Sequence, residues 1–317
     1  MINAVISGTG GYIPEKQLTN IELESMLDTS DEWIVSRTGI SSRSIAQDHE
    51  TTSYMASKAA EQALKASGLD ANEIDLIIVA TCTPDHFFPG VACYVQHALK
   101  IERPIPAFDV GAACSGFVYI MDIAKQYIAS GAAKHVLVIG SESMSRAVDW
   151  SDRSTCVLFG DGAGAVILSA SDKPGILGSV LHASYDAEKF LSLINATFQP
   201  ERASINMRGN EVFKLAVNIM GGVVDEVLEL SQLKKSDIQW LIPHQANMRI
   251  IQAIAKKLEL PMSQVIVTIG TQGNTSAASI PLALDHSIRS NQIKRDELLL
   301  IESFGGGMTW GAMVIRY

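Results

Sequence analysis

The sequence predicts an α/β protein made of two copies of one β-α-β-α-β-α-β-β unit, stacked as a five-layer α/β/α/β/α sandwich. Two observations predict this class. Apolar strands alternate with amphipathic helices along all 317 residues, which is typical of largely parallel sheets covered on both faces. The element order of the first half also recurs in the second, and a chain of this length exceeds what one ordinary core organises.

The repeat is clearest where a helix end, a polar turn and an apolar strand follow one another. The stretch GLDANEIDLIIVAT (68–81) matches QLKKSDIQWLIPHQ (232–245) in this respect. Amphipathic helices are expected on both sides of each stretch, at 52–68 and 91–101 in the first half and at 211–231 and 248–260 in the second.

The correspondence extends to the end of each half. Short strands are expected at 105–110 and 264–269, and each is followed by a small-residue turn that opens a helix. Strands and glycine-rich turns then close both halves, at 135–143 and 159–170 and again at 297–305 and 304–317. We therefore divide the chain into an N-terminal half, 1–171, and a C-terminal half, 172–317.

Two long non-repetitive segments, 14–50 and 184–209, occupy equivalent places between the first strand and the first long helix of each half. The first contains a capping box, Thr19-x-x-Glu22, which predicts a short helix. Insertions of this length are often functional, so we expect them to form walls of a substrate tunnel.

Composition narrows the function classes. The net charge of −9 argues against bulk binding of nucleic acid, and the apolar runs are far shorter than a membrane span. No secretory signal is visible at the start, and the four cysteines lack metal-ligand spacing. These features favour a reduced cytoplasmic protein without a metal or membrane partner.

Three residues stand at the carboxyl ends of repeated strands, where open α/β sheets bind ligands. Cys114 lies in the first half, and His244 and Asn274 lie in the second, with Cys114 and Asn274 at equivalent helix starts. A thiol at a helix N-terminus is favoured as thiolate, and nearby N–H groups can stabilise an oxyanion. Each residue alone has an ordinary structural explanation, but their joint placement favours a catalytic site.

Two reaction classes use cysteine, histidine and asparagine together. One is hydrolysis of a thioester or peptide of the papain type, in which the amide orients the imidazole. The other is carbon–carbon condensation on thioesters, in which the cysteine carries an acyl group. There the imidazole and the amide hydrogen-bond the thioester oxygen of a malonyl donor and stabilise the enolate left when CO2 departs. The absence of a CGSCW-like signature favours condensation.

Long motifs along the whole chain resemble the thiolase-like condensing enzymes, and more narrowly the β-ketoacyl-acyl-carrier-protein synthase III family. They are GTGGYIPE (8–15), DTSDEWIVSRTGI (28–40), FDVGAACSGF (108–117), FGDGAGA (159–165), GNEVFK (209–214), PHQAN (243–247), GNTSAAS (273–279) and FGGGMTWG (304–311). The resemblance implies that acyl-CoA, typically acetyl-CoA, acylates Cys114. Malonyl-acyl-carrier protein then condenses with the acyl-enzyme and initiates type II fatty acid synthesis. A related enzyme of specialised metabolism with another primer or acceptor is the alternative.

The resemblance also implies the roles of further residues. The backbone N–H groups of Cys114 and Gly306 would form the oxyanion hole, and Phe88 would line the acyl pocket across a homodimer interface. The CoA site carries over to Thr29, Trp33, Arg37, Arg153, Gly209, Phe213 and Asn247. A basic dock for the acidic carrier protein is expected at Lys214, Arg249, Lys256 and Lys257. No resident cofactor is implied, because acyl-CoA is a substrate.

Overall fold

Two β-sheets organise the structure, a computed structural model that describes residues 2–200 and 203–317. One sheet has five strands and the other four, and the four correspond in order to the first four of the five. The first sheet has the order β1-β7-β6-β4-β5 and the second β8-β13-β12-β11. The strands of the first are β1 (Asn3–Tyr12), β4 (Leu76–Ala80), β5 (Ala107–Val110), β6 (His135–Ser143) and β7 (Asp161–Ser171). Those of the second are β8 (Ile176–Ala183), β11 (Trp240–Pro243), β12 (Leu298–Gly305) and β13 (Thr309–Arg316).

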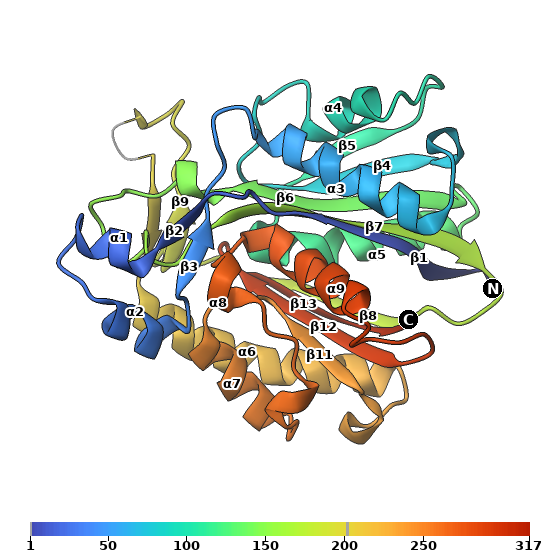
Figure 1. Cartoon of the computed structure of the whole chain (residues 1–317). Coiled ribbons are helices and arrows are strands. Elements are labelled where there is room, and N and C mark those ends of the chain that lie inside the picture. Colours follow the sequence, from blue (N-terminus) through green and yellow to red (C-terminus); the bar gives the residue numbers. More distant parts are fainter. Residues whose placement is uncertain (1, 201–202) are drawn as a thin grey trace.

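Helices cover both faces of each sheet, which gives the predicted five layers (Figure 1). Helices α3 and α4 lie on the outer face of the first sheet, and α6 and α7 on the outer face of the second. Helices α5 and α9 form the middle layer. Their bounds are α3 (Thr52–Ser67), α4 (Val91–Ala98), α5 (Gly116–Ala129), α6 (Gly209–Leu230), α7 (Met248–Lys257) and α9 (Ser279–Arg289).

The middle layer joins the two halves through one apolar core. Phe117 of α5 and Ile280 of α9 are buried together with Ile78 of the first sheet and Ile301 of the second. Burying a side chain of this size contributes about 1.5–3 kcal/mol. The predicted boundary after residue 171 falls in the turn between β7 and β8, so the chain changes sheets there while the core continues across.

One predicted strand is wrong. Residues 264–269 form only an isolated bridge from Val265 to Leu241, and the chain then enters the short helix α8 (Ile269–Gln272). The side chain of Gln245 explains the difference. Its amide nitrogen donates to the Ile266 carbonyl and its oxygen accepts from the N–H groups of Thr268 and Ile269, so a side chain takes the place of a neighbouring strand.

The two insertions fold as small additions beside the sheets. Segment 14–50 contains the antiparallel pair of strands β2 and β3, with α1, which carries the predicted capping box, and α2 between them. The bounds are β2 (Gln17–Thr19), α1 (Asn20–Glu24), α2 (Asp31–Thr38) and β3 (Ser42–Ser44). Segment 184–209 contains the paired strands β9 (Leu191–Leu193) and β10 (Ile205–Met207). Residues 201–202 of this segment lie outside the described residues.

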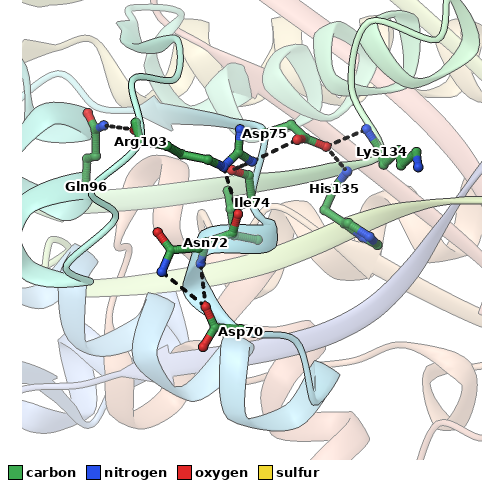
Figure 2. A network of polar contacts seen from close by, with 8 residues as sticks. All are labelled: Asp70, Asn72, Ile74, Asp75, Gln96, Arg103, Lys134 and His135. Carbon is green, nitrogen blue, oxygen red and sulfur yellow. Dashed lines mark hydrogen bonds and ion pairs between the residues drawn. The ribbon is translucent and has the colours of Figure 1, made fainter.

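A polar network ties the amino-terminal ends of β4 and β6 together (Figure 2). The Asp75 carboxylate accepts from the backbone N–H groups of Lys134 and His135 at 2.7 and 3.0 Å and from the Arg103 guanidinium at 2.8 Å. Arg103 also donates to the carbonyls of Asn72 and Ile74. Because the network satisfies backbone groups at the strand ends opposite Cys114, we assign it a structural role.

Among the helices of the described residues, none combines the length and the apolar character needed to cross a bilayer.

Candidate active site

One large cavity, about 1570 Å³ in volume, is lined by Cys114, His244 and Asn274 together. The three residues are 7%, 7% and 6% exposed. Both halves therefore contribute to one buried site, as the repeat predicted. The walls also include Trp33 and Arg37 from the first insertion and Leu191 and Met207 from the second, which confirms the expectation that both insertions line the tunnel.

The predicted equivalence of Cys114 and Asn274 within the repeat is wrong by three positions. Cys114 lies in a 3₁₀ turn, Ala113–Ser115, directly before α5, and the matching turn of the second half is Ser276–Ala278, directly before α9. Ala113 and Ser276, the first residues of the two turns, have φ of 46° and 50°. Ala277 is thus the counterpart of Cys114, and Asn274 precedes the turn rather than opening the helix.

The surroundings of the Cys114 thiol favour its protonated form. Burial raises the pKa of the thiol to about 11, and the nearby Glu142 carboxylate acts in the same direction. A hydrogen bond with Ser276 and the backbone N–H of Cys114 itself oppose this change. Loss of solvent around the thiol thus acts against the predicted preference for thiolate, and the hydrogen bonds act in its favour.

Backbone packing around the nucleophile is very close. A Cβ at Gly305 would lie 2.8 Å from the Cys114 backbone nitrogen, so only glycine fits at this position. Ser303 on the same strand donates to the Cys114 carbonyl at 2.8 Å. Gly306 lines the same cavity as Cys114, and its part in an oxyanion hole stays a prediction. Strand β12 therefore fixes the position of Cys114 in the turn before α5.

His244 is a neutral imidazole directly after β11. Burial lowers the pKa of the ring to about 3, and its Nδ1 lies 2.7 Å from the Ser279 hydroxyl. The backbone N–H of His244 donates to the Glu302 carbonyl at 2.9 Å, which continues the pairing of β11 with β12. The residue lines the cavity, and Nε2 makes no hydrogen bond with the described part of the chain.

Asn274 is held by the first half of the chain. Its backbone N–H donates to the Leu158 carbonyl at 2.8 Å, and its carbonyl accepts from the N–H of Gly160 at 3.1 Å. Its side-chain oxygen accepts from the Ser276 N–H at 2.9 Å. This contact fixes the orientation of the amide, so that the NH2 group is free to donate to a ligand in the cavity.

The predicted CoA residues lie mainly at one part of the cavity wall. The Arg37 and Arg153 guanidinium carbons lie 4.8 and 5.2 Å from the centre of the Trp33 ring. Asn247 caps α7 and donates to the Arg37 carbonyl at 3.0 Å, which connects α7 to the first insertion. Cavity-lining residues from the prediction are Trp33, Arg37, Arg153, Gly209, Phe213 and Asn247.

Thr29 is the exception, since it is not among the residues that line the cavity. Its hydroxyl is buried and has no hydrogen-bond partner among residues 2–200 and 203–317. The neighbouring Asp28 carbonyl accepts a hydrogen bond from Arg153. Thr29 therefore lies beside the predicted nucleotide region without contributing to its wall.

Phe88 is 87% exposed and Phe87 is 73% exposed, so neither packs in the core of this chain. Both nevertheless belong to the residues around the cavity, together with Thr81 and Cys82 at the end of β4. The exposed rings lie beside the first sheet, whose edge strand is β5. Two adjacent exposed phenylalanines are unusual unless another surface covers them.

The four predicted docking cations are exposed and come from two neighbouring helices, α6 and α7. They are Lys214, Arg249, Lys256 and Lys257. The Lys257 ammonium donates to the α6 carbonyls of Val217 and Asn218 at 3.4 and 3.2 Å, so part of its hydrogen-bonding capacity is used within the chain.

Sequence analysis missed two buried carboxyl groups on the cavity side of the strands. Glu142 accepts hydrogen bonds from Thr81, Cys82, Thr83 and Ser276, and burial raises its pKa. Glu302 lines the cavity, and burial raises its pKa to about 8. Both occur inside apolar strands of the repeat, at HVLVIGSES and ELLLIESFG, where a charged residue is unusual and could have drawn attention.

Comparisons with known proteins agree with this architecture. Family models described as 3-oxoacyl-[acyl-carrier-protein (ACP)] synthase III and its C-terminal part match residues 108–184 and 228–317. A β-ketoacyl-[acyl-carrier-protein] synthase III from Coxiella burnetii is 52% identical over the full length of both chains. One from Methylococcus capsulatus is 53% identical over 98% of both.

A crystal structure of 3-oxoacyl-[acyl-carrier-protein] synthase III from Aquifex aeolicus superposes with a TM-score of 0.95. It is 50% identical and covers 99% of this chain and 100% of its own. The expected thiolase-like fold is confirmed by this likeness. The full-length identity and the shared fold show that this chain belongs to the β-ketoacyl-[acyl-carrier-protein] synthase III family of condensing acyltransferases.

Proposed function

We propose that this enzyme, which initiates fatty acid biosynthesis, condenses a short acyl-CoA primer, acetyl-CoA in the first instance, with malonyl-acyl-carrier protein. The main support is that one cavity brings together the thiol of Cys114 and two neutral side chains that can donate hydrogen bonds, those of His244 and Asn274. The products are a 3-ketoacyl-carrier protein, CO2 and CoA.

In the first proposed step the Cys114 sulfur attacks the acyl carbonyl carbon. A new carbon–sulfur bond forms, the bond to the CoA sulfur breaks, and the proton of the Cys114 thiol ends on the departing CoA thiol. The N–H groups of Cys114 and Gly306 would stabilise the oxyanion. His244 is a poor base for this proton, because burial lowers its pKa to about 3.

In the second proposed step the malonyl thioester binds with its carbonyl oxygen between His244 and Asn274. The carbon–carbon bond to the carboxylate breaks, CO2 leaves, and the electron pair forms an enolate held by two neutral donors. The enolate carbon attacks the acyl-enzyme carbonyl, the bond to the Cys114 sulfur breaks, and the electron pair of that bond leaves on the sulfur. The resulting thiolate takes up a proton from solvent, which restores the Cys114 thiol. Neutral donors suit this step because a carboxylate would repel the developing charge.

Substrate binding is assigned to the residues around the cavity mouth. We propose that Trp33, Arg37 and Arg153 bind the nucleotide of CoA, since guanidinium groups suit phosphates and stack on aromatic rings. Further contacts are proposed for Thr29, Gly209, Phe213 and Asn247. The cations Lys214, Arg249, Lys256 and Lys257 would attract an acidic carrier protein. The proposal uses no metal and no resident cofactor.

A homodimer is part of the proposal. The edge strand β5 and the exposed rings of Phe87 and Phe88 support it, because pairing with a second copy would cover both. Phe88 would then contribute to the acyl pocket of the partner. We also propose a cytoplasmic location, which the four free cysteines support.

The hydrolase alternative is disfavoured by the hydrogen bonds of the site. In a papain-type enzyme the asparagine orients the histidine. Here His244 Nδ1 pairs with Ser279, and the Asn274 oxygen pairs with the Ser276 N–H. The amide thus orients no catalytic imidazole. Condensation with a different primer remains the alternative within the same family.

The test supplies labelled acetyl-CoA and malonyl-carrier protein and follows the label first on Cys114 and then in ketoacyl product. Cys114→Ala should abolish acyl transfer and leave decarboxylation of malonyl-carrier protein, which depends on His244 and Asn274. A label that is hydrolysed from Cys114 and never reaches ketoacyl product contradicts the proposal. A panel of straight and branched acyl-CoA primers then distinguishes the alternatives.

A further inference from the structure

We infer that Ser279 is a positioning residue that holds His244 in the tautomer with hydrogen on Nε2, so that the imidazole is a hydrogen-bond donor toward the cavity. The contact that carries this is the 2.7 Å separation of the Ser279 hydroxyl oxygen from His244 Nδ1. Ser279 is 1% exposed, and it is the first residue of α9. The tautomer is inferred from the contacts alone, and its effect on the reaction rests on the proposed function.

The direction of this hydrogen bond follows from the second contact of the same hydroxyl. The backbone N–H of Gln245 points to the Ser279 oxygen at 3.3 Å, and an N–H can only donate. If Nδ1 also carried a hydrogen, the oxygen would accept twice and its own hydrogen would have no acceptor among the described residues. A buried hydroxyl whose hydrogen has no acceptor is unfavourable, so the hydroxyl donates to Nδ1.

Neutrality of the ring completes the assignment. A neutral imidazole has one hydrogen, and when Nδ1 accepts from Ser279 that hydrogen must be on Nε2. Within residues 2–200 and 203–317 no titratable side chain hydrogen-bonds the ring, and the hydrogen bond between Glu302 and His244 joins their backbones. The Nε2–H therefore has no competing partner before substrate enters.

The tautomer separates the two half-reactions. With hydrogen on Nε2, the ring has no lone pair on its cavity edge and cannot accept a proton there from Cys114. It can only donate, as Asn274 does through its NH2 group. Ser279 should therefore affect decarboxylation and condensation, in which the donor pair acts, while acyl transfer from acyl-CoA to Cys114 should proceed without it.

The experiment compares the full-length Ser279→Ala variant with the full-length wild-type enzyme by nitrogen NMR, with nitrogen-labelled histidine in both. The His244 signals are assigned by their absence in His244→Ala. Wild type should show an unprotonated Nδ1 and a protonated Nε2, and Ser279→Ala should show both tautomers in exchange. Decarboxylation of malonyl-carrier protein should fall about tenfold or more, as is typical when the partner that orients a functional histidine is removed. Acyl transfer from acetyl-CoA should stay within twofold of wild type.

Ser287→Ala is the matched control. Ser287 is also buried on α9, and its hydroxyl has no hydrogen-bond partner in the described part of the chain. This variant should keep the wild-type tautomer and both half-reactions. An unchanged His244 spectrum in Ser279→Ala would overturn the inference, and so would a parallel loss of both half-reactions. A wild-type enzyme that forms no ketoacyl product would contradict the proposed function while the spectrum still reports on Ser279.

Discussion

Asn274→Asp tests the requirement for a neutral donor with almost no change in shape. Asn274 is 6% exposed, and one side-chain oxygen would still accept from the Ser276 N–H. The NH2 group that faces the cavity would become a second oxygen. At neutral pH the variant therefore loses one donor to the thioester oxygen and gains a negative charge beside the enolate.

The size of the effect follows from these two changes. Removing one donor from an oxyanion site costs about 2.7–4 kcal/mol, a factor of 10² to 10³ in rate. Two like charges about 4 Å apart repel by about 4 kcal/mol at an effective dielectric constant of 20. We expect decarboxylation by Asn274→Asp at pH 7 to fall at least 10²-fold, and more than in Asn274→Ala.

The pH profile distinguishes the two contributions. Burial raises the pKa of a carboxyl group, so Asn274→Asp becomes protonated as the pH falls, and the neutral acid can again donate. Its decarboxylation rate should recover between pH 7 and pH 5, while that of Asn274→Ala should not. The assay follows CO2 release from malonyl-carrier protein. A rate for Asn274→Asp within tenfold of wild type at pH 7, or parallel profiles of the two variants, would refute the reasoning.

Three further changes have defined outcomes. Gly305→Ala would place a Cβ 2.8 Å from the Cys114 nitrogen. We expect acyl transfer to be at least tenfold slower and the free energy of unfolding to fall by about 1–3 kcal/mol. The hydrogen bond from Ser303 to the Cys114 carbonyl should remain. For Glu302→Gln we compare the free energy of unfolding in urea with that of wild type, and we expect the variant's advantage over wild type to be larger at pH 8.5 than at pH 5. The pKa of Glu302 in the native protein is about 8, above the ordinary 4.5, so the stability that protonated Glu302 contributes is full below pH 4.5 and lost as the pH rises through 8. An equal difference in unfolding free energy between the variant and wild type at the two pH values would contradict this. Asp75→Ala leaves two strand-end N–H groups without their acceptor and should cost about 1–3 kcal/mol in unfolding free energy, with both half-reactions unchanged in the labelled assay.

The repeat predicted the architecture because strand and helix patterns are local properties of the sequence. Helix 52–68 was observed as Thr52–Ser67, and the apolar end of the stretch 68–81 forms β4. The missing strand at 264–269 depends on a side chain, Gln245, that binds backbone groups more than twenty residues away. No pattern within 264–269 contains that information.

The sequence was enough to predict which residues come together in the cavity, but not their protonation or hydrogen bonds. The joint placement of Cys114, His244 and Asn274 followed from strand ends and the repeat. The protonation of Cys114 did not, because it depends on how completely neighbouring segments exclude water. Ser279 was within the motif GNTSAAS, but only the folded geometry shows that its hydroxyl faces His244 Nδ1.

The backbone bonds of Asn274 to Leu158 and Gly160 have a consequence for motion. A hinge between the halves would have to break these bonds and open the apolar middle layer around Phe117 and Ile280. Domain closure of the kind seen in many two-lobed enzymes is therefore unavailable to this fold. Cys114, His244 and Asn274, which come from both halves, therefore stay at fixed distances from one another.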